Sequence, residues 1–292
     1  MRKPKQSHYD YFELLQLAYD GRELRIVHRQ RVGLEEMVPG WRISGAGLTN
    51  PISDGDDLLV GAQGGRPGRT PGCGLLRWRR SRGAWRPAAF DLITPEDNSI
   101  EPSVVREGGG DLLFLARGRR ESGPPVRVWR SRDNGRSWQR TIFINGLVGS
   151  VPISLNQAVD GTPYVASNLY TPWIKVPGGD AGISRLEPAG GRGERSTLCI
   201  WPLNERRDGL EAPLLARDCR TEFGVPPSGT VWAADHPSAM TLQLGDGEWH
   251  HVLGYRLLDW KENTHFIAPS PRTGAYVEEV FSVGEPVPPW NF

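Results

Sequence analysis

Four residues of this chain have side chains suited to acid–base chemistry, and three of them lie at X-Pro steps. Glu101 stands directly before Pro102, and Asp235 and His236 come directly before Pro237. Two carboxyl groups can cleave a glycosidic bond, one as general acid and the other as base or nucleophile. A histidine titrates near neutrality and can move protons, as can a tyrosine near a carboxylate. We expect the catalytic residues to be Glu101, Asp235, His236 and Tyr276.

Each of these residues also has a structural interpretation that the sequence leaves open. Glu101 could form an ion pair with an arginine of a neighbouring repeat unit. A lone histidine such as His236 is more often structural, and Tyr276 is compatible with a buried core position.

Six further residues have the chemistry to hold a sugar or another polar ligand. Arginines bind carboxylates bidentately, tryptophan offers a stacking surface, and asparagines near the starts of strands donate and accept hydrogen bonds. The expected substrate-binding residues are Asn50, Arg117, Asn156, Trp173, Arg256 and Arg272.

An internal repeat predicts how these residues are positioned. X-Pro steps followed by strand-like runs have their prolines at positions 51, 102, 152 and 237, with spacings of 51, 50 and 85. The segment LLRWRRSRGAWRPAAF (75–90) parallels VRVWRSRDNGRSWQRTIF (126–143), with Trp85 and Trp138 in matching places. A looser copy surrounds Trp249. A unit of roughly 50 residues with short strands and Gly or Asp turns is typical of a β-propeller blade.

The predicted fold class is therefore all-β, as one β-propeller domain over residues 1–292 with four-stranded blades. A β-sandwich would need no internal copies of equal length. The blades are predicted at 45–93, 98–145, 150–217 and 228–270. Residues 8–33, a hairpin across Asp20-Gly21, and 275–283 would share a closing blade, which gives five blades, with six as the alternative. The segment 171–198, rich in Gly and Pro, is expected to be a long loop over one face.

The stretch SRDNGRSW, Ser131 to Trp138, is predicted to be a structural turn rather than a catalytic site. Asp133 can accept hydrogen bonds from backbone N–H groups of the turn, and Gly135 provides a positive φ. Ser137 can tie the turn to the next strand, and Trp138 can bury its ring between sheets.

This stretch resembles the Asp-box of the sialidase-like propellers, also called bacterial neuraminidase repeats, and the resemblance extends over residues 101–138. It implies a propeller that carries a hydrolase, a lyase or a binding module, with the Asp-box on the face away from the site. In sialidases the nucleophilic tyrosine lies near the C-terminus, where Tyr276 stands here. Typical sialidases open the corresponding strand with Arg-Ile-Pro, whereas this chain has Ile100-Glu101-Pro102, so sialic acid is not the implied substrate.

Composition excludes several classes of partner. The formal net charge of +1 gives no electrostatic basis for binding nucleic acid or an anionic membrane. Three widely spaced cysteines indicate neither a disulfide framework nor a zinc site, and His250 and His251 would point to opposite faces of a strand. We expect no cofactor and no metal.

The N-terminal residues contain no apolar signal core, so a cytoplasmic protein is expected, or a secreted one if a signal was removed. The sequence leaves the oligomeric state open.

The preferred function is a glycoside hydrolase that acts on a carbohydrate through Glu101 and Asp235. One alternative is a polysaccharide lyase, in which His236 or Tyr276 removes the proton next to a uronate carboxylate held by Arg256 or Arg272. The other is a non-catalytic propeller that binds a glycan or a protein, in which the polar residues do not converge or are neutralised by arginines.

Overall fold

A computed structural model describes most of the chain and shows an all-β protein. The described residues are 11–33, 37–47, 51–94, 99–118, 126–144, 153–157, 161–171, 173–176, 185–188, 195–207, 209–212, 215–225, 232–243, 249–259, 264–265 and 277–282. Among them, the only α-helix is the short α1 (Cys219–Phe223), and no helix is long and apolar enough to cross a membrane.

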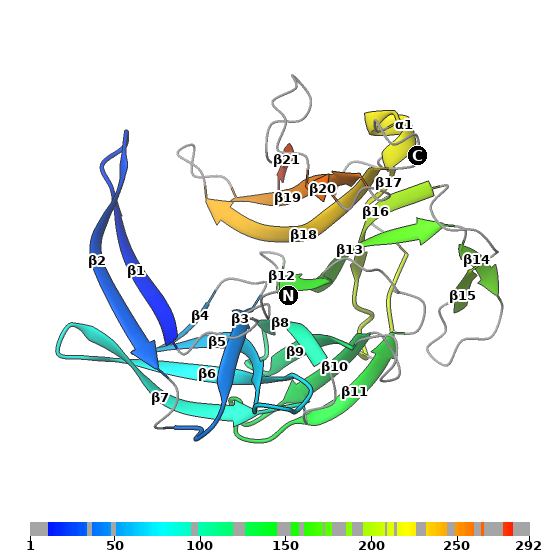
Figure 1. The fold of residues 1–292 in the computed structure, drawn as a ribbon. Coiled ribbons are helices and arrows are strands. Elements are labelled where there is room, and N and C mark those ends of the chain that lie inside the picture. Colours follow the sequence, from blue (N-terminus) through cyan, green and yellow to red (C-terminus); the bar gives the residue numbers. More distant parts are fainter. Residues whose placement is uncertain are drawn as a thin grey trace, which may run out of the picture.

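Four antiparallel sheets follow one another along the chain (Figure 1). The first contains β3 (Arg42–Ala46), β4 (Ile52–Asp54), β5 (Asp57–Gly65), β6 (Gly72–Ser81) and β7 (Ala84–Leu92), with β3 and β4 both paired to β5. The second contains β8 (Ser99–Arg106), β9 (Leu112–Gly118), β10 (Val126–Ser131) and β11 (Gln139–Ile144) in sequence order.

The third sheet has the order β12 (Ser154–Gln157), β13 (Pro163–Thr171), β16 (Arg195–Pro202), β17 (Leu215–Asp218). The fourth contains β18 (Trp232–Gln243) and β19 (Trp249–Asp259), with β20 (Thr264–His265) and β21 (Val277–Ser282) both paired to β19. The first three sheets follow the predicted blade ranges closely, and the fourth lies within 228–270 except for β21. The all-β propeller architecture predicted from the repeats is confirmed.

The first strands of successive sheets lie next to each other near the middle of the molecule (Figure 1). β8 contacts β3, β4 and β5 of the first sheet and β12 of the third, and β12 contacts β18. This places the inner strands, and the residues on them, around a common centre.

The predicted closing blade is wrong in its pairing. Residues from the two ends do not share a sheet: β1 (Tyr11–Tyr19) and β2 (Leu24–Gly33) pair with each other, whereas β21 pairs with β19. The reason is the length of β19. β20 pairs only with Leu258 and Asp259, so the edge of residues 250–255 is open, and β21 satisfies its backbone groups.

The hairpin across Asp20-Gly21 is confirmed. Asp20 Oδ1 accepts hydrogen bonds from the backbone N–H groups of Arg22 and Glu23, at 3.0 and 2.9 Å, and Gly21 has φ 90°. The hydrogen bonds that Asp20 accepts from Glu23 and Arg22 lower the pKa of its carboxyl. Within the expected loop 171–198 the structure instead has a second hairpin, β14 (Trp173–Val176) and β15 (Arg185–Pro188).

The core lies between neighbouring sheets, and β9 shows why. Its run LLFLA is apolar at every position because both of its faces are covered. Leu112 and Phe114 join a cluster with Leu59 and Leu75 of the first sheet. The alternate residues Leu113 and Leu115 join a second cluster with residues of β12, β13 and β16. Burying each such side chain contributes about 1.5–3 kcal/mol to the stability of the fold. Because these side chains lie between neighbouring sheets, their burial favours this order of the sheets.

Candidate functional site

Glu101 occupies a β-bulge on the inner strand of the second sheet. In the β8–β9 pair, Ile100 is opposite Arg117 and Ser103 is opposite Leu115, so Glu101 and Pro102 are the bulged residues. Glu101 has φ 55°, a left-handed conformation that is unfavourable for a residue with a long side chain. Such strain persists only where the surroundings impose it, and it is concentrated at functional sites.

The carboxylate of Glu101 is held in a two-point ion pair by Arg117 of β9. Arg117 Nε lies 2.5 Å from Glu101 Oε2, and Arg117 Nη2 lies 2.7 Å from Oε1. The side chain of Arg117 is 13% exposed and that of Glu101 is 19% exposed. The ion pair is therefore largely shielded from solvent but still reaches the surface. The sequence offered an arginine of a neighbouring repeat as the structural partner, whereas the structure provides one from the same sheet.

The first sheet fixes the backbone at this bulge. The N–H of Glu101 donates to the side-chain oxygen of Gln63, on β5. A Cβ on Gly47 would lie 2.9 Å from the carbonyl oxygen of Pro102, and one on Gly61 would lie 3.2 Å from its Cβ. Only glycine permits this approach, so Gln63, Gly47 and Gly61 position Glu101 from the neighbouring sheet. Sequence reasoning missed these three residues.

A bulge of the same kind occurs on β18. Asp235 is opposite Arg256 and Ser238 is opposite Gly254, which leaves His236 and Pro237 as the bulged residues. His236 therefore corresponds to Glu101, and Arg256 corresponds to Arg117. The structure thus gives two of the predicted arginines equivalent places. Each lies on the second strand of its sheet, opposite the residue that directly precedes the bulge.

Asn156 lies on β12, the inner strand of the third sheet. It is buried, and its Nδ2 donates to Ser154 Oγ at 2.9 Å. The strand runs in the same direction as β8, because a Cβ on Gly161, in the turn after β12, would lie 3.4 Å from the N atom of Gly108, in the turn after β8. The starts of β8 and β12 therefore also share one end of the molecule, which we call the strand-start end.

The remaining predicted residues are placed less completely. Asn50, Arg272 and Tyr276 lie outside the described residues. Trp173 begins β14, in the small hairpin beside the third sheet, with Pro188 opposite it. Among the residues that the structure describes, no group of three or more His, Cys, Asp or Glu could hold a metal ion.

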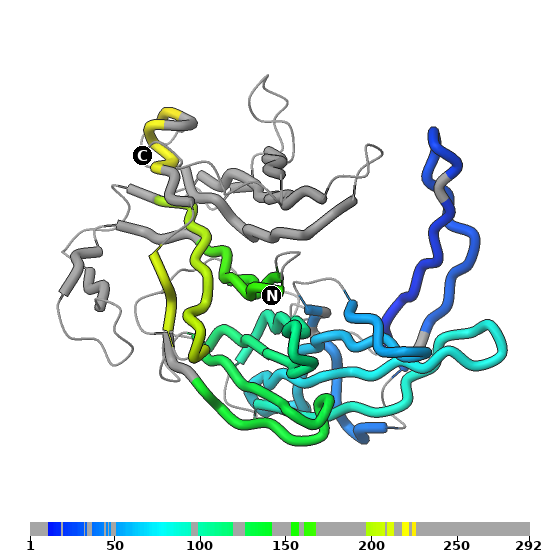
Figure 2. Tube along the Cα trace, turned by 180° about the vertical axis from the view of Figure 1, so that it is seen from behind, coloured from blue at the N-terminus to red at the C-terminus, as the bar shows by residue number. Residues whose placement is uncertain are grey.

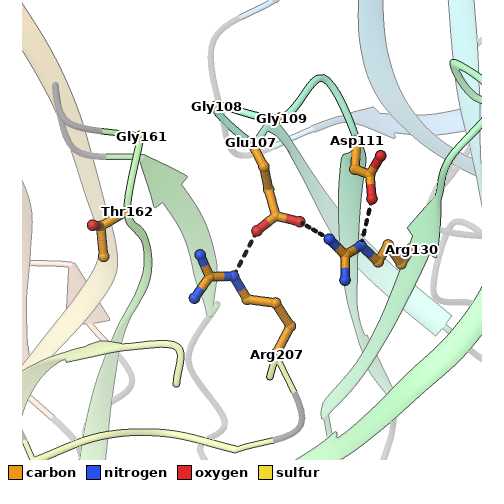
Figure 3. A pocket seen from close by; sticks show the side chains of 8 residues that line it. All are labelled: Glu107, Gly108, Gly109, Asp111, Arg130, Gly161, Thr162 and Arg207. Carbon is orange, nitrogen blue, oxygen red and sulfur yellow. Dashed lines mark hydrogen bonds and ion pairs between the residues drawn. The ribbon is translucent and has the colours of Figure 1, made fainter. Parts of the chain in front are cut away.

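A cavity of about 400 Å³ lies at the opposite end of β8, which we call the turn end (Figure 3). Its lining comes from the turn between β8 and β9, from β10, from the turn between β12 and β13 and from the segment after β16, and consists of Glu107, Gly108, Gly109, Asp111, Arg130, Gly161, Thr162 and Arg207. None of these residues was predicted as a site, although the run EGGGD marks the first turn.

The charged groups of this cavity bind one another. Arg207 Nε lies 2.5 Å from Glu107 Oε1, and Arg130 Nη2 lies 3.2 Å from Glu107 Oε2 (Figure 3). Arg130 Nε donates to Asp111 Oδ2 at 2.7 Å. Arg207 also donates to the carbonyl oxygens of Leu203 and Asn204. This chain of ion pairs ties the second sheet to the third, which favours a structural role for the cavity over a binding role.

The turn Ser131–Trp138 lies at this same end, because Ser131 is paired with Leu112. Asp133 Oδ1 accepts from the N–H groups of Arg136 and Ser137, and Asp133 Oδ2 accepts from Ser137 Oγ. The hydrogen bonds from Ser137 and then Ser131 lower the pKa of Asp133 to about 2. Gly135 has φ 87°, and the Trp138 ring packs edge-to-face on Phe114 at 5.7 Å. The predicted roles of Asp133, Gly135 and Trp138 are confirmed, whereas Ser137 binds Asp133 within the turn instead of the next strand. The turn lies away from Glu101.

Comparisons with known proteins add information on the fold. No protein-family model matches the chain, and no curated protein matches it in sequence. Among solved structures, the phage phi92 endosialidase is similar to it with a TM-score of 0.51 and 13% identity, over 89% of this chain and 39% of that chain. The Trypanosoma rangeli sialidase in complex with 2,3-difluorosialic acid has a TM-score of 0.43 and 13% identity, over 93% and 37% of the two chains.

A third similar structure is a GH43_12 protein retrieved from a capybara gut metagenome, with a TM-score of 0.46, 12% identity and coverage of 85% and 42%. The chain thus spans about two fifths of the length of each of these structures. At such low identity the likeness concerns the fold, and it agrees with the propeller built from the four sheets.

Proposed function

We propose that this chain is a carbohydrate-active hydrolase whose site lies at the strand-start end of the inner strands. The observation that carries the proposal is the conformation of Glu101: a carboxylate on a strained bulge, anchored by Arg117 and positioned by the neighbouring sheet. A site for acid–base catalysis needs such pre-positioning, since small displacements of the reacting group are costly to the rate. The similar structure with a TM-score of 0.51 is named an endosialidase, a glycan-cleaving protein, which supports the substrate class.

In this proposal the two carboxylates have different roles. Glu101, as the anion paired with Arg117, accepts a proton from the attacking water or attacks the anomeric carbon itself. Asp235, which directly precedes the corresponding bulge on β18, donates a proton to the leaving oxygen. Arg256 has the place on β19 that Arg117 has on β9, and it would bind a polar group of the sugar. Asn156 is not part of this proposal, because it is buried, donates to Ser154 Oγ and lies next to the last residue of β12, towards the turn at Gly161.

The first experiment measures turnover of a panel of aryl glycosides and uronate polysaccharides, with Glu101→Gln as the test variant. The substitution removes the charge and keeps the shape, so we expect kcat/KM to fall at least about 10²-fold with the circular dichroism spectrum unchanged. Reducing ends measure hydrolysis, and ultraviolet absorbance of an unsaturated uronate measures the lyase reaction.

The same strand provides a matched control. Glu107, at the other end of β8, is also a glutamate paired with arginines, but it lies in the cavity at the turn end. Glu107→Gln should lower stability and leave kcat unchanged. Equal loss of turnover in both variants would mean that Glu101 acts only through the fold, and full activity in Glu101→Gln would refute its catalytic role.

A second candidate function is a non-catalytic propeller that binds a glycan, and the ion pair itself favours it. Arg117 forms an ion pair with both carboxylate oxygens of Glu101. A carboxylate neutralised by an arginine is what we expect in a non-catalytic binding module. Binding of glycans to the purified chain, with no product from any member of the panel, would make this the better description.

A further inference from the structure

The exposed apolar side chains of the described residues are concentrated on the hairpin β1–β2. The described residues include eight large hydrophobic residues that are exposed. Six of the eight belong to this hairpin: Tyr11, Leu15, Leu17, Leu24, Ile26 and Val27. Their exposure ranges from 42% to 61%. The hairpin projects from the four sheets as a two-stranded arm, as both views of the molecule show (Figures 1 and 2).

The strand register shows that five of the six lie on one face. Tyr11, Leu15 and Leu17 alternate along β1, and Ile26 is opposite Leu17, with Leu24 two residues before Ile26. Arg31, on this face, lies over the Tyr11 ring at 4.9 Å from its centre, and Arg29 and Arg31 pair with Glu13. Val27 is the extra residue of the bulge between the Gln16 and Leu17 pairs. We call this set of Tyr11, Leu15, Leu17, Leu24 and Ile26 the outer face.

The opposite face of the hairpin is the one that attaches it to the propeller. Phe12 and Leu14 pack on the first-sheet cluster, and the Phe12 ring meets Trp78 edge-to-face at 6.1 Å. Gln30 Nε2 donates to the carbonyl oxygen of Trp85 at 2.6 Å. The base is therefore fixed and the outer face points away from its own body. A two-stranded hairpin is marginally stable in water unless one of its faces is covered along its length.

We propose that the outer face is the contact surface of a homodimer, in which the hairpins of two copies stack face to face about a two-fold axis. A two-fold contact uses the same patch on both copies, which suits a single apolar face and is the commonest symmetry of oligomers. The five apolar residues of the outer face expose roughly 500 Å² per copy, and together with Glu13, Arg29 and Arg31 on the same face they approach the roughly 800 Å² per partner of a stable interface.

Charge does not oppose this contact. Residues 11–33 contain three acidic residues and four arginines, a formal net charge of +1. Glu13 pairs with Arg29 and Arg31, and Arg25 pairs with Asp20 and Glu23, so two hairpins can approach without an excess of like charge. A near-neutral apolar face is suited to another copy of itself more than to a strongly charged partner.

Sedimentation equilibrium of the full chain tests this inference. We expect the wild type to be in a monomer–dimer equilibrium at micromolar concentrations. Leu17→Glu places a charge at the centre of the outer face and should raise the dissociation constant of the dimer at least about 30-fold, as the loss of one central contact does. Leu17 is half exposed in the single copy, so the variant should keep the thermal stability of the dissociated wild-type chain.

Leu92→Glu is the matched control, because Leu92 is equally exposed but lies at the end of β7, outside the hairpin. It should dimerise as the wild type does. A wild type that sediments as a monomer over the whole concentration range overturns the inference, as does a dimer that survives Leu17→Glu or that Leu92→Glu also dissociates. Glycan turnover plays no part in this readout, so the result stands independently of the proposed function.

Discussion

The conformation of one residue distinguishes Glu101 from the other acidic side chains. A left-handed conformation costs a non-glycine residue about 1–3 kcal/mol, and a following proline restricts the backbone further. The cost is tolerated because Arg117, Gln63 and two glycines of the first sheet hold the bulge from several sides. Sequence reasoning identified Glu101 and Arg117 separately, from chemistry and from the X-Pro step. Their pairing depends on which residues the bulge sets opposite each other, and no local pattern shows that.

Asp133 allows a test at the scale of a single turn. Its pKa is lowered to about 2 by hydrogen bonds from Ser137 and Ser131, so the charged form stabilises the fold at every pH above the ordinary value near 4. That stabilisation decreases as the pH falls below about 4 and is lost as the pH falls through about 2. We expect Asp133→Asn to lower the melting temperature at pH 7, and the difference from the wild type to disappear towards pH 2. A difference that stayed constant over this range would contradict the assignment.

At the scale of elements, the Ser131–Trp138 turn also connects two sheets. Asp54, the last residue of β4, accepts from Asn134 Nδ2 and Arg77 Nη1, both at 2.7 Å, and from Arg106 Nη2 at 3.1 Å. Arg77 in turn donates to the carbonyl oxygen of Asn134 at 2.8 Å. The hydrogen bond from Asn134 is the largest cause of the lowered pKa of Asp54. Two successive sheets are therefore joined at the turn end by a network centred on one carboxylate.

Removing this carboxylate should weaken the attachment of the two sheets. Asp54→Ala leaves two arginines and an asparagine without their common acceptor, and we expect it to lower the free energy of unfolding by about 2 kcal/mol. Asp56→Ala, two residues away at an exposed position, should change it by less than about 0.5 kcal/mol. Midpoints of urea denaturation compare the two variants, and equal effects would show that the network contributes nothing specific.

The elements themselves could be predicted to different degrees. The ranges of the four sheets follow from the repeat, because each X-Pro step and each Gly or Asp turn is a local signal with a fixed spacing. The pairing of β21 could not be predicted in this way, since it depends on the length of β19 and on the short partner β20. The hairpin β14–β15 was also missed, because the segment 171–198 as a whole is rich in the Gly and Pro that indicate a loop, and its two strands of four residues each are short.

At the scale of the whole molecule, the four sheets and the arm serve different purposes. The sheets share buried side chains with their neighbours, and their inner strands contact one another around one centre. The arm shares only its base with the first sheet. The sequence predicted the arm as part of a closing blade because its two strands are too few for a blade of their own. Their alternation reports which side chains share a face, but it does not report what covers that face.

The burial of all three cysteines has a practical consequence for following motion in this protein. Cys73 lies between the first and second sheets, whereas Cys199 and Cys219 lie in and beside the third, and all three side chains are buried. Burial also raises the pKa of the Cys199 thiol. A thiol-alkylating reagent should therefore modify each cysteine only when its own region opens. Read peptide by peptide with mass spectrometry, Cys199 and Cys219 should be alkylated at a common rate that differs from the rate of Cys73. One shared rate for all three would show instead that the sheets open together. The native thiols thus report whether local opening occurs separately in different sheets.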